Sequence, residues 1–269
     1  SMLPRRDAGP RLGAARHALQ RDGFCVIRRL VPASDVEQLL DMAAVEARSL
    51  EHMAHSEAMW RLRTNVAVMN AFATLWDVPP CELIVGFDGM LLDQASHVVG
   101  WHVDQDGSHD NVMDGIQCIV ALAPSDSETG SVRFLRGSHM VFEYAVEACP
   151  RKTGKWEATF LSDRQWMYRN LDVCMPALRA GDAVFWDSRT LHSVPPARRP
   201  GAHRSVAFLS YSPRHLATDD VLRRRRDAHK RGVHTTHWPH RFVARNGACS
   251  RPSRYTDTVP SDVRQRLVG

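Results

Sequence analysis

The chain has 269 residues, of which 43% are hydrophobic and 24% charged, and its formal net charge is +5. This composition is typical of a soluble globular protein and allows a substantial core without disulfide bonds. No apolar run is long enough to cross a bilayer, and the N-terminal residues lack the apolar stretch of a signal peptide, so we expect no membrane partner and a reducing intracellular compartment such as the cytoplasm.

The cysteines and the basic residues point to no special chemistry. Six cysteines are spread through the chain without a CxxC pair. Cys25 and Cys118 lie inside apolar runs, which predicts buried reduced thiols rather than disulfides or a zinc site. Much of the excess positive charge lies in residues 223–231. That run permits binding to nucleic acid or to an acidic substrate, but no aromatic residues alternate with the basic ones, so we interpret it as a solvated helix or loop.

Residues 11–80 are predicted to be mainly helical. Apolar residues recur at helical spacing before Gly23, which interrupts the pattern, and residues 24–27 then form a short apolar run typical of a buried strand. A second helix is expected from about residue 34 to residue 53, and a further helical segment ends before Pro79.

Short β-like runs then alternate with turns from residue 81 to about residue 212. The clearest runs are residues 82–87, 89–92, 116–122, 131–135, 183–186 and 205–211. Strands at this spacing predict a mainly β fold with flanking helices, whose core is a double-stranded β-helix of the jelly-roll or cupin-like type.

The remaining segments complete a single expected domain. Residues 143–172 form a mixed insertion, and the tail, residues 213–269, is basic and expected to be irregular after one helix near residues 219–231. No repeat and no long linker divides the chain. We therefore expect one domain over residues 1–269, with a helical N-terminal part (11–80), a jelly-roll core (about 81–212) and a C-terminal tail (213–269).

The sequence Gly-Trp-His-Val-Asp-Gln at residues 100–105 carries the first chemical signal. In a strand, residues two apart point to the same side, so His102 and Asp104 would present an imidazole and a carboxylate together. These are two ligands of a facial triad of two histidines and one carboxylate, which leaves positions open on iron(II). Alone, such a pair also fits a surface strand end or a structural hydrogen bond, because the chain contains 14 histidines.

A second element lies further along the chain. Gly181-Asp182 forms a turn, an apolar strand follows, and His192 comes after it, before two prolines. A histidine in this place could face the His102–Asp104 pair across a jelly roll. Twelve residues later Arg204 opens another strand. An arginine beside a metal suits a dicarboxylate cosubstrate, because its planar guanidinium binds a carboxylate with two hydrogen bonds.

Taken in order, these motifs resemble the phytanoyl-CoA dioxygenase-like family of iron(II)- and 2-oxoglutarate-dependent oxygenases. The resemblance covers roughly residues 20–212. It includes Arg-Asp-Gly-Phe-Cys-Val-Ile from residue 21, the His102–Asp104 strand, Glu-Thr-Gly from residue 128, Gly-Ser-His from residue 137, the His192 block and Arg204. The chain departs from the family in two places, since Arg136 precedes Gly-Ser-His and a serine follows the distal histidine directly.

The resemblance implies a role for each of these residues. His102, Asp104 and His192 would be the metal ligands and the catalytic centre, and Arg204 would bind the distal carboxylate of 2-oxoglutarate, with Arg198 as its rival. Ser193 would be a further contact of the cosubstrate. Fe(II), 2-oxoglutarate and O₂ would then oxidise a C–H bond of a small molecule, by hydroxylation or a related reaction, with release of succinate and CO₂.

The substrate pocket and the tail are read from the residues themselves. Trp101, Gln105, Asp106 and Gln117 are candidates for the pocket wall, although ordinary strand packing explains them equally well. The tail is expected to fold over the open end of the jelly roll. Three tail histidines are predicted to bind no metal, because no cysteine pair accompanies them and Pro239 bars a regular helix; they are His234, His237 and His240.

Three alternatives remain at this point. An oxygenase acting on a nucleic-acid base fits the basic tail, but no base-binding motif supports it. A non-catalytic cupin-like binding protein fits the fold, but a complete triad is not needed for binding alone. A zinc hydrolase could use the same three ligands, but Arg204 and the Gly-Ser-His element favour the oxygenase. The sequence sets neither the substrate nor the oligomeric state.

Overall fold

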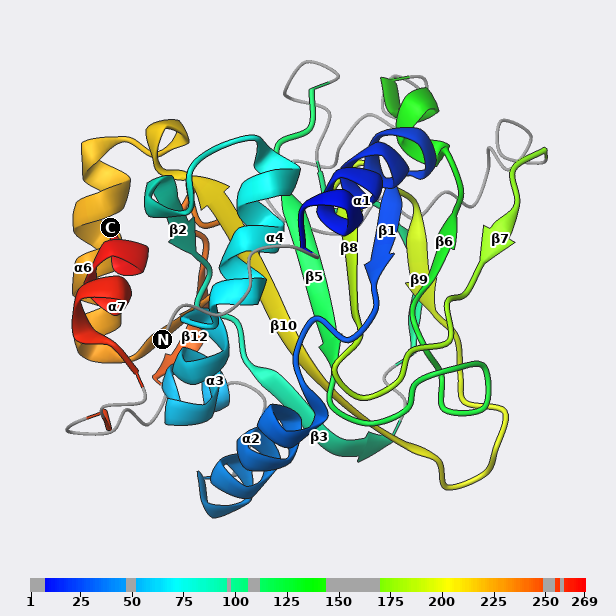
Figure 1. Ribbon diagram of the computed structural model, residues 1–269, viewed down its shortest axis with the longest axis horizontal. Coiled ribbons are helices and arrows are strands. Elements are labelled where there is room, and N and C mark those ends of the chain that lie inside the picture. The colour runs from blue at the N-terminus through cyan, green and yellow to red at the C-terminus, as the bar shows by residue number, and fades with distance from the viewer. Residues whose placement is uncertain are drawn as a thin grey trace.

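The computed structural model describes residues 8–46, 52–95, 98–105, 112–143, 170–248, 255–256 and 259–269. Most of the predicted insertion at residues 143–172 lies outside these ranges. Two antiparallel sheets form the centre, with helices against the larger sheet (Figure 1). This is the expected mainly β, jelly-roll architecture with flanking helices. None of the described helices has the length and apolar character to cross a membrane.

The larger sheet has the strand order β1-β8-β5-β10-β2, with β3 paired to β10, and the smaller sheet has the order β4-β9-β6-β7. The strands of the larger sheet are β1 (Phe24–Ile27), β2 (Leu83–Val85), β3 (Met90–Ala95), β5 (Ile116–Ala121), β8 (Ala183–Asp187) and β10 (His203–Pro213). Those of the smaller sheet are β4 (Val99–His102), β6 (Arg133–Leu135), β7 (Val173–Cys174) and β9 (His192–Val194).

The helices are α1 (Ala8–Asp22), α2 (Ala33–Glu46), α3 (Glu57–Arg63), α4 (Val66–Trp76), α6 (Asp219–Arg231) and α7 (Ser261–Val268). Short 3-10 turns are η1 (His52–His55), η2 (Pro80–Glu82), η3 (Ser138–Val141) and η5 (Arg214–Leu216). The helical segment predicted before Pro79 is two helices, because Asn65 accepts hydrogen bonds from the backbone of Ala67 and Val68 and so begins α4 as a new helix.

Side-chain alternation along β5 explains how one strand serves two layers. Cys118 and Val120 belong to the core between the large sheet and the helices, whereas Ile119 and Ala121 belong to the core between the two sheets. Both faces are covered, so all six residues of β5 are buried. Gln117 shares the face of Ile119 and therefore points toward the smaller sheet.

The tail is more regular than the sequence indicated. The predicted helix is α6, but after it β11 (Val233–Thr235) pairs with β12 (Ala244–Ala248), and α7 packs near β2. Arg225 of α6 is fully buried and donates hydrogen bonds to the carbonyl oxygens of Val85, Pro239 and Val268. These contacts tie the tail to the sheet, which local sequence patterns could not reveal.

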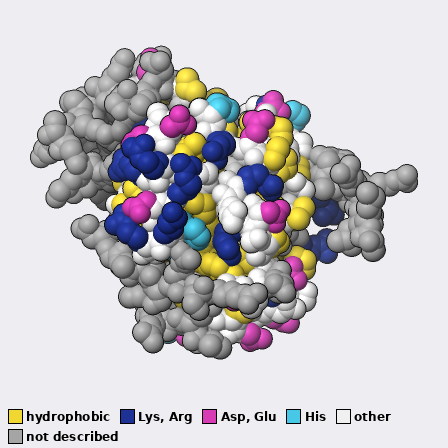
Figure 2. All heavy atoms as spheres, turned by 90° about the vertical axis from the view of Figure 1, so that its left-hand side faces the viewer, with side chains coloured by type: hydrophobic (Ala, Val, Ile, Leu, Met, Phe, Trp, Pro, Cys, Tyr) yellow, Lys and Arg dark blue, Asp and Glu magenta, His cyan; other side chains and the backbone are white. Residues whose placement is uncertain are grey.

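Lys and Arg side chains gather on the face formed by α6 and α7 (Figure 2). Several are neutralised within α6 itself. Arg223 pairs with Asp220, and Arg231 pairs with Asp227 at 2.8 Å. These pairs fit the interpretation of the basic run as a solvated helix face, except at Arg225, which is buried.

Candidate metal centre

The pairing of two strands brings the two histidines of the candidate triad together. His102 ends β4, His192 begins β9, and the two residues are direct partners in the antiparallel register. Their imidazole centroids lie 4.2 Å apart. The sequence suggested that these histidines could face each other, and the register of the smaller sheet is what places them side by side.

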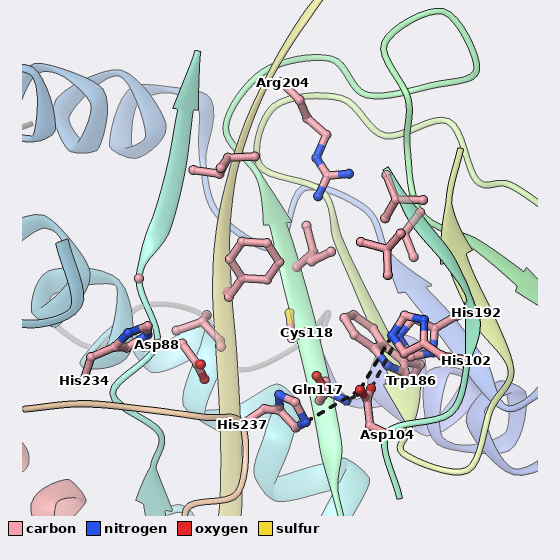
Figure 3. A pocket seen from close by; sticks show the side chains of 18 residues that line it. Asp88, His102, Asp104, Gln117, Cys118, Trp186, His192, Arg204, His234 and His237 are labelled. Carbon is pink, nitrogen blue, oxygen red and sulfur yellow. Dashed lines mark hydrogen bonds and ion pairs between the residues drawn. The ribbon is translucent and has the colours of Figure 1, made fainter. Parts of the chain in front are cut away.

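Asp104 completes a compact set of three possible ligands. One side-chain atom each of His102, Asp104 and His192 lies within 4.8 Å of the other two. Nε2 of His192 is 3.3 Å from Oδ2 of Asp104, and Nε2 of His102 is 3.7 Å from Oδ1 (Figure 3). Two imidazole nitrogens and one carboxylate on one side of a cavity are the donor set of a facial triad for Fe(II), so the residues present fit this metal.

Both histidines are oriented by the backbone. Nδ1 of His102 is 2.8 Å from the carbonyl oxygen of Gly100, and Nδ1 of His192 is 2.9 Å from that of Thr190. A carbonyl only accepts hydrogen bonds, so each Nδ1 carries the proton and each Nε2 keeps its lone pair. This is the tautomer that metal binding requires, with the ring orientation fixed in advance.

The charges within the triad are strongly coupled. Burial alone would raise the pKa of Asp104, but the imidazoles of His192, His237 and His102 and a hydrogen bond from Gln117 together hold that pKa well below its usual range. Burial is the main cause that lowers the pKa of His192 to about 4, against the opposing charge of Asp104. An anionic carboxylate beside the neutral imidazole of His192 is a charge state that suits a divalent cation.

Arg204 lies in β10, buried, with its guanidinium directed into the same cavity (Figure 3). One nitrogen donates to the carbonyl oxygen of Gly130 at 3.0 Å, and Nε is buried with no hydrogen-bond partner. Burial lowers the pKa of Arg204 to about 10. Among the described residues no carboxylate lies within ion-pair distance of it. A buried guanidinium with unused donors fits an anionic ligand such as the carboxylate of 2-oxoglutarate.

A cavity of about 370 Å³ joins the triad to Arg204. Its middle is apolar, and the lining there includes Ile119, Val132, Val194 and Phe208. Figure 3 shows Arg204 at one end of the cavity and the triad at the other. The volume lies near the lower end of the range for small-molecule sites, so only a small ligand, or one end of a larger one, fits beside a cosubstrate.

Of the predicted pocket residues, only Gln117 lines this cavity, and its amide donates a hydrogen bond to Asp104. Trp101 lies beneath the guanidinium of Arg133 at 4.6 Å, on the side of β4 opposite to His102. Gln105 is buried, accepts a hydrogen bond from the hydroxyl of Ser188 at 2.7 Å, and donates to Val112. Asp106 lies outside the described residues.

Ser193 is also not brought to the cavity. It follows His192 in β9, so its side chain points to the opposite face of the strand. There its hydroxyl accepts a hydrogen bond from Arg133 at 2.7 Å. His139 of the Gly-Ser-His element has its Nε2 2.9 Å from the carbonyl oxygen of Gln20.

The cavity wall contains three polar residues that the sequence did not assign to it: Asp88, His234 and His237. The two histidines come from the tail, which therefore reaches the site as predicted. His237 is the closer to the triad, with Nε2 3.7 Å from Oδ1 of Asp104. The spacing of the tail histidines was visible in the sequence, but their nearness to Asp104 was not.

Comparison with known proteins supports the resemblance over part of the chain. Residues 92–204 match the family model of phytanoyl-CoA dioxygenase (PhyH), a segment that contains the triad and Arg204. Over this segment the match bears out the resemblance inferred from the motifs.

The individual relatives of this chain are distant. Ava biosynthesis cluster protein O of Aspergillus versicolor is 28% identical over 214 residues, which is 71% of this chain and 66% of that protein. The chain thus spans just under two thirds of the length of this relative.

Similar solved structures share the fold. The epimerase SnoN, solved with Fe3+, alpha ketoglutarate and nogalamycin RO, is 19% identical with a TM-score of 0.57, over 75% of this chain and 83% of SnoN. The non-heme monooxygenase ThoJ is 15% identical with a TM-score of 0.55, over 94% of this chain and 93% of ThoJ. The carbocyclase SnoK is 17% identical with a TM-score of 0.51, over 74% of this chain and 82% of SnoK.

Proposed function

We propose that this protein is an Fe(II)- and 2-oxoglutarate-dependent oxygenase that oxidises a C–H bond of a small natural-product molecule. His102, Asp104 and His192 hold the metal, and Arg204 binds the distal carboxylate of 2-oxoglutarate. One observation carries the proposal: the triad and the guanidinium of Arg204 line the same cavity. That guanidinium is buried and has no acidic partner among the described residues.

The chemistry that iron, 2-oxoglutarate and O₂ supply when bound is oxidation of a substrate C–H bond coupled to release of succinate and CO₂. The chain's own residues prepare the site for it. The triad occupies one side of the metal position and leaves the other side open to the cavity. The carbonyl oxygens of Gly100 and Thr190 fix the imidazole tautomers, and apolar residues exclude water from the space between the triad and Arg204.

The substrate class follows from the cavity and from the relatives. The cavity of about 370 Å³ has room for a small molecule, or for one end of a larger one, beside a cosubstrate. SnoN, SnoK and Ava biosynthesis cluster protein O are all named for natural-product biosynthesis. We therefore propose a secondary metabolite or its precursor, with hydroxylation as the reaction, and with epimerisation or ring closure as other outcomes of the same C–H activation.

A direct test measures succinate and product together. The purified protein is supplied with Fe(II), 2-oxoglutarate and O₂ and screened against a panel of polyketide and alkaloid precursors, with mass spectrometry of the products. We expect iron-dependent succinate release that rises with the true substrate and an oxidised product, both absent in His102→Ala. A protein that binds neither Fe(II) nor 2-oxoglutarate would instead fit the non-catalytic cupin-like alternative.

A further inference from the structure

His237 is an unassigned polar group beside the metal centre. Its Nε2 lies 3.7 Å from Oδ1 of Asp104, and its side chain lines the cavity. Within the described residues it makes no hydrogen bond. It does not belong to the compact set formed by His102, Asp104 and His192. The imidazole of His237 thus lies beside Asp104, one of the three candidate ligands (Figure 3).

We propose that His237 is a positioning residue of the metal centre, which donates a hydrogen bond to Oδ1 of Asp104 directly or through one water, so that the C-terminal tail completes the centre. The separation of 3.7 Å is longer than a direct hydrogen bond and suits a small ring rotation or one bridging water. The proposal rests on the proposed function, because it takes Asp104 to be a ligand.

The two oxygens of Asp104 support this assignment. Oδ2 accepts a hydrogen bond from the amide of Gln117, so one side of the carboxylate is already fixed. Among the described residues, the imidazoles of His102 and His237 are the ion-pair partners of Oδ1, each at 3.7 Å. With His102 engaged by a metal, His237 is the side chain in this part of the structure that could donate to Oδ1. Groups that hold metal ligands in place commonly change metal affinity by 10–100-fold when removed.

The residues that follow His237 hold this part of the tail in place. Trp238 is only 1% exposed and packs against Gly115, where a Cβ atom would come within 2.7 Å of the indole ring. His240 bridges Ser212 at 2.9 Å and Asp114 at 3.1 Å. The tail is therefore anchored immediately after His237, so the backbone of His237 is held close to Asp104 while Trp238 stays docked.

The docking of Trp238 on Gly115 is also connected to Asp104 through a series of backbone contacts. The backbone N–H of Asp104 donates to the carbonyl oxygen of Ser188 at 3.2 Å. The N–H of Ser188 donates to Gly115 at 3.0 Å, and the N–H of Gly115 donates to the hydroxyl of Ser188 at 3.1 Å. Trp238 packs against Gly115, and the preceding residue, His237, lies beside Asp104. Displacement of the tail should therefore change the position of Asp104.

Metal affinity tests the proposal without knowledge of the substrate. Co(II) is titrated anaerobically into the full chain and followed by its visible absorption and by competition with a chromophoric chelator. We expect His237→Leu to weaken Co(II) binding by about tenfold or more. His237→Gln, which keeps a donor, should recover most of that affinity. The matched control is His215→Leu, an exposed tail histidine, which should bind Co(II) as the parent does.

A second variant tests the coupling through the tail. Trp238→Ala should weaken Co(II) binding to a similar extent. The double variant, with both His237→Leu and Trp238→Ala, should bind Co(II) only slightly more weakly than either single variant. Equal Co(II) affinity in the parent and in folded His237→Leu, or no recovery in His237→Gln, would overturn the proposal. Failure of the proposed function is distinguishable, because the parent itself would then bind no Co(II) and His102→Ala would change nothing.

Discussion

Gln117 of the larger sheet donates a hydrogen bond to the carboxylate of Asp104, which follows the last strand residue of β4 in the smaller sheet. The proposed metal centre is therefore held from both sheets. His102 and His192 come from one of them, and the side chain that orients the third ligand comes from the other.

Removal of this amide should weaken metal binding. Gln117→Leu keeps the side-chain volume but leaves one carboxylate oxygen of Asp104 without its donor, so we expect Co(II) affinity to fall by about tenfold. Anaerobic titration provides the measurement. Gln38→Leu, on the exposed surface of α2, is the matched control and should show no change. Unchanged affinity in folded Gln117→Leu would mean that Asp104 is oriented without it.

The triad can be tested through ligand-induced stability. A ligand present at about 100 times its Kd stabilises a folded protein by about 2.7 kcal/mol, so Co(II) should raise the Tm by about 5 °C or more. His102→Ala and His192→Ala should abolish that rise while the metal-free proteins remain folded. Differential scanning fluorimetry with and without Co(II) measures it. His203→Ala, an exposed histidine beside Arg204, should keep the full rise.

Arg204 should determine 2-oxoglutarate affinity. A charge-assisted hydrogen bond contributes about 1.5–3 kcal/mol, so Arg204→Ala should weaken 2-oxoglutarate binding to the Co(II)-loaded protein by about 10-fold to 150-fold. Arg204→Lys keeps the charge but loses the second hydrogen bond, so its affinity for 2-oxoglutarate should lie between those of the parent and of Arg204→Ala. Calorimetry measures both. Arg198→Ala, the exposed rival, should bind as the parent does; the reverse order would assign the cosubstrate to Arg198.

Asp182 should contribute a pH-dependent part of the stability. Burial would raise its pKa, but hydrogen bonds from the N–H of Arg179, the side chain of Arg28 and the N–H of Arg29 outweigh it and lower the pKa. A carboxylate with a lowered folded pKa stabilises the fold above its unfolded pKa of about 4 and loses this contribution as the pH falls below it.

Asp182→Asn should therefore reduce the free energy of unfolding by about 1–3 kcal/mol at pH 7. The difference between parent and variant should shrink as the pH falls below about 4. Urea denaturation at several pH values measures it. A difference that stays constant across this range would show that the charge of Asp182 is not responsible.

Gly115 should be intolerant of a side chain. A Cβ there would lie 2.7 Å from the ring of Trp238, so Gly115→Ala should displace the tail and lower the free energy of unfolding by about 1–3 kcal/mol. Intrinsic tryptophan fluorescence and urea denaturation report the change. Gly13→Ala in α1, where no atom lies within 4 Å of the added Cβ, is the matched control and should be neutral or stabilising.

Local patterns in the sequence were sufficient to predict the fold class and the residues of the candidate metal centre. The short strands and turns predicted the β-rich core, and the alternation of a strand placed His102 and Asp104 on one side. The order of motifs gave the resemblance to phytanoyl-CoA dioxygenase that the family model bears out over residues 92–204. The residue types at His192 and Arg204 suggested the proposed metal and cosubstrate roles. These features depend on spacing along the chain, which the sequence states directly.

The tertiary structure decided which neighbouring side chains reach the cavity. Trp101, Gln105 and Ser193 are adjacent to triad residues in sequence, but strand alternation and the hydrogen bonds of Ser188 and Arg133 turn them away from it. Gln117 and His237 are far from Asp104 in sequence and lie beside it, because sheet packing and the docking of Trp238 on Gly115 are long-range events. Contacts of this kind depend on how separate elements pack, and no local pattern encodes that packing.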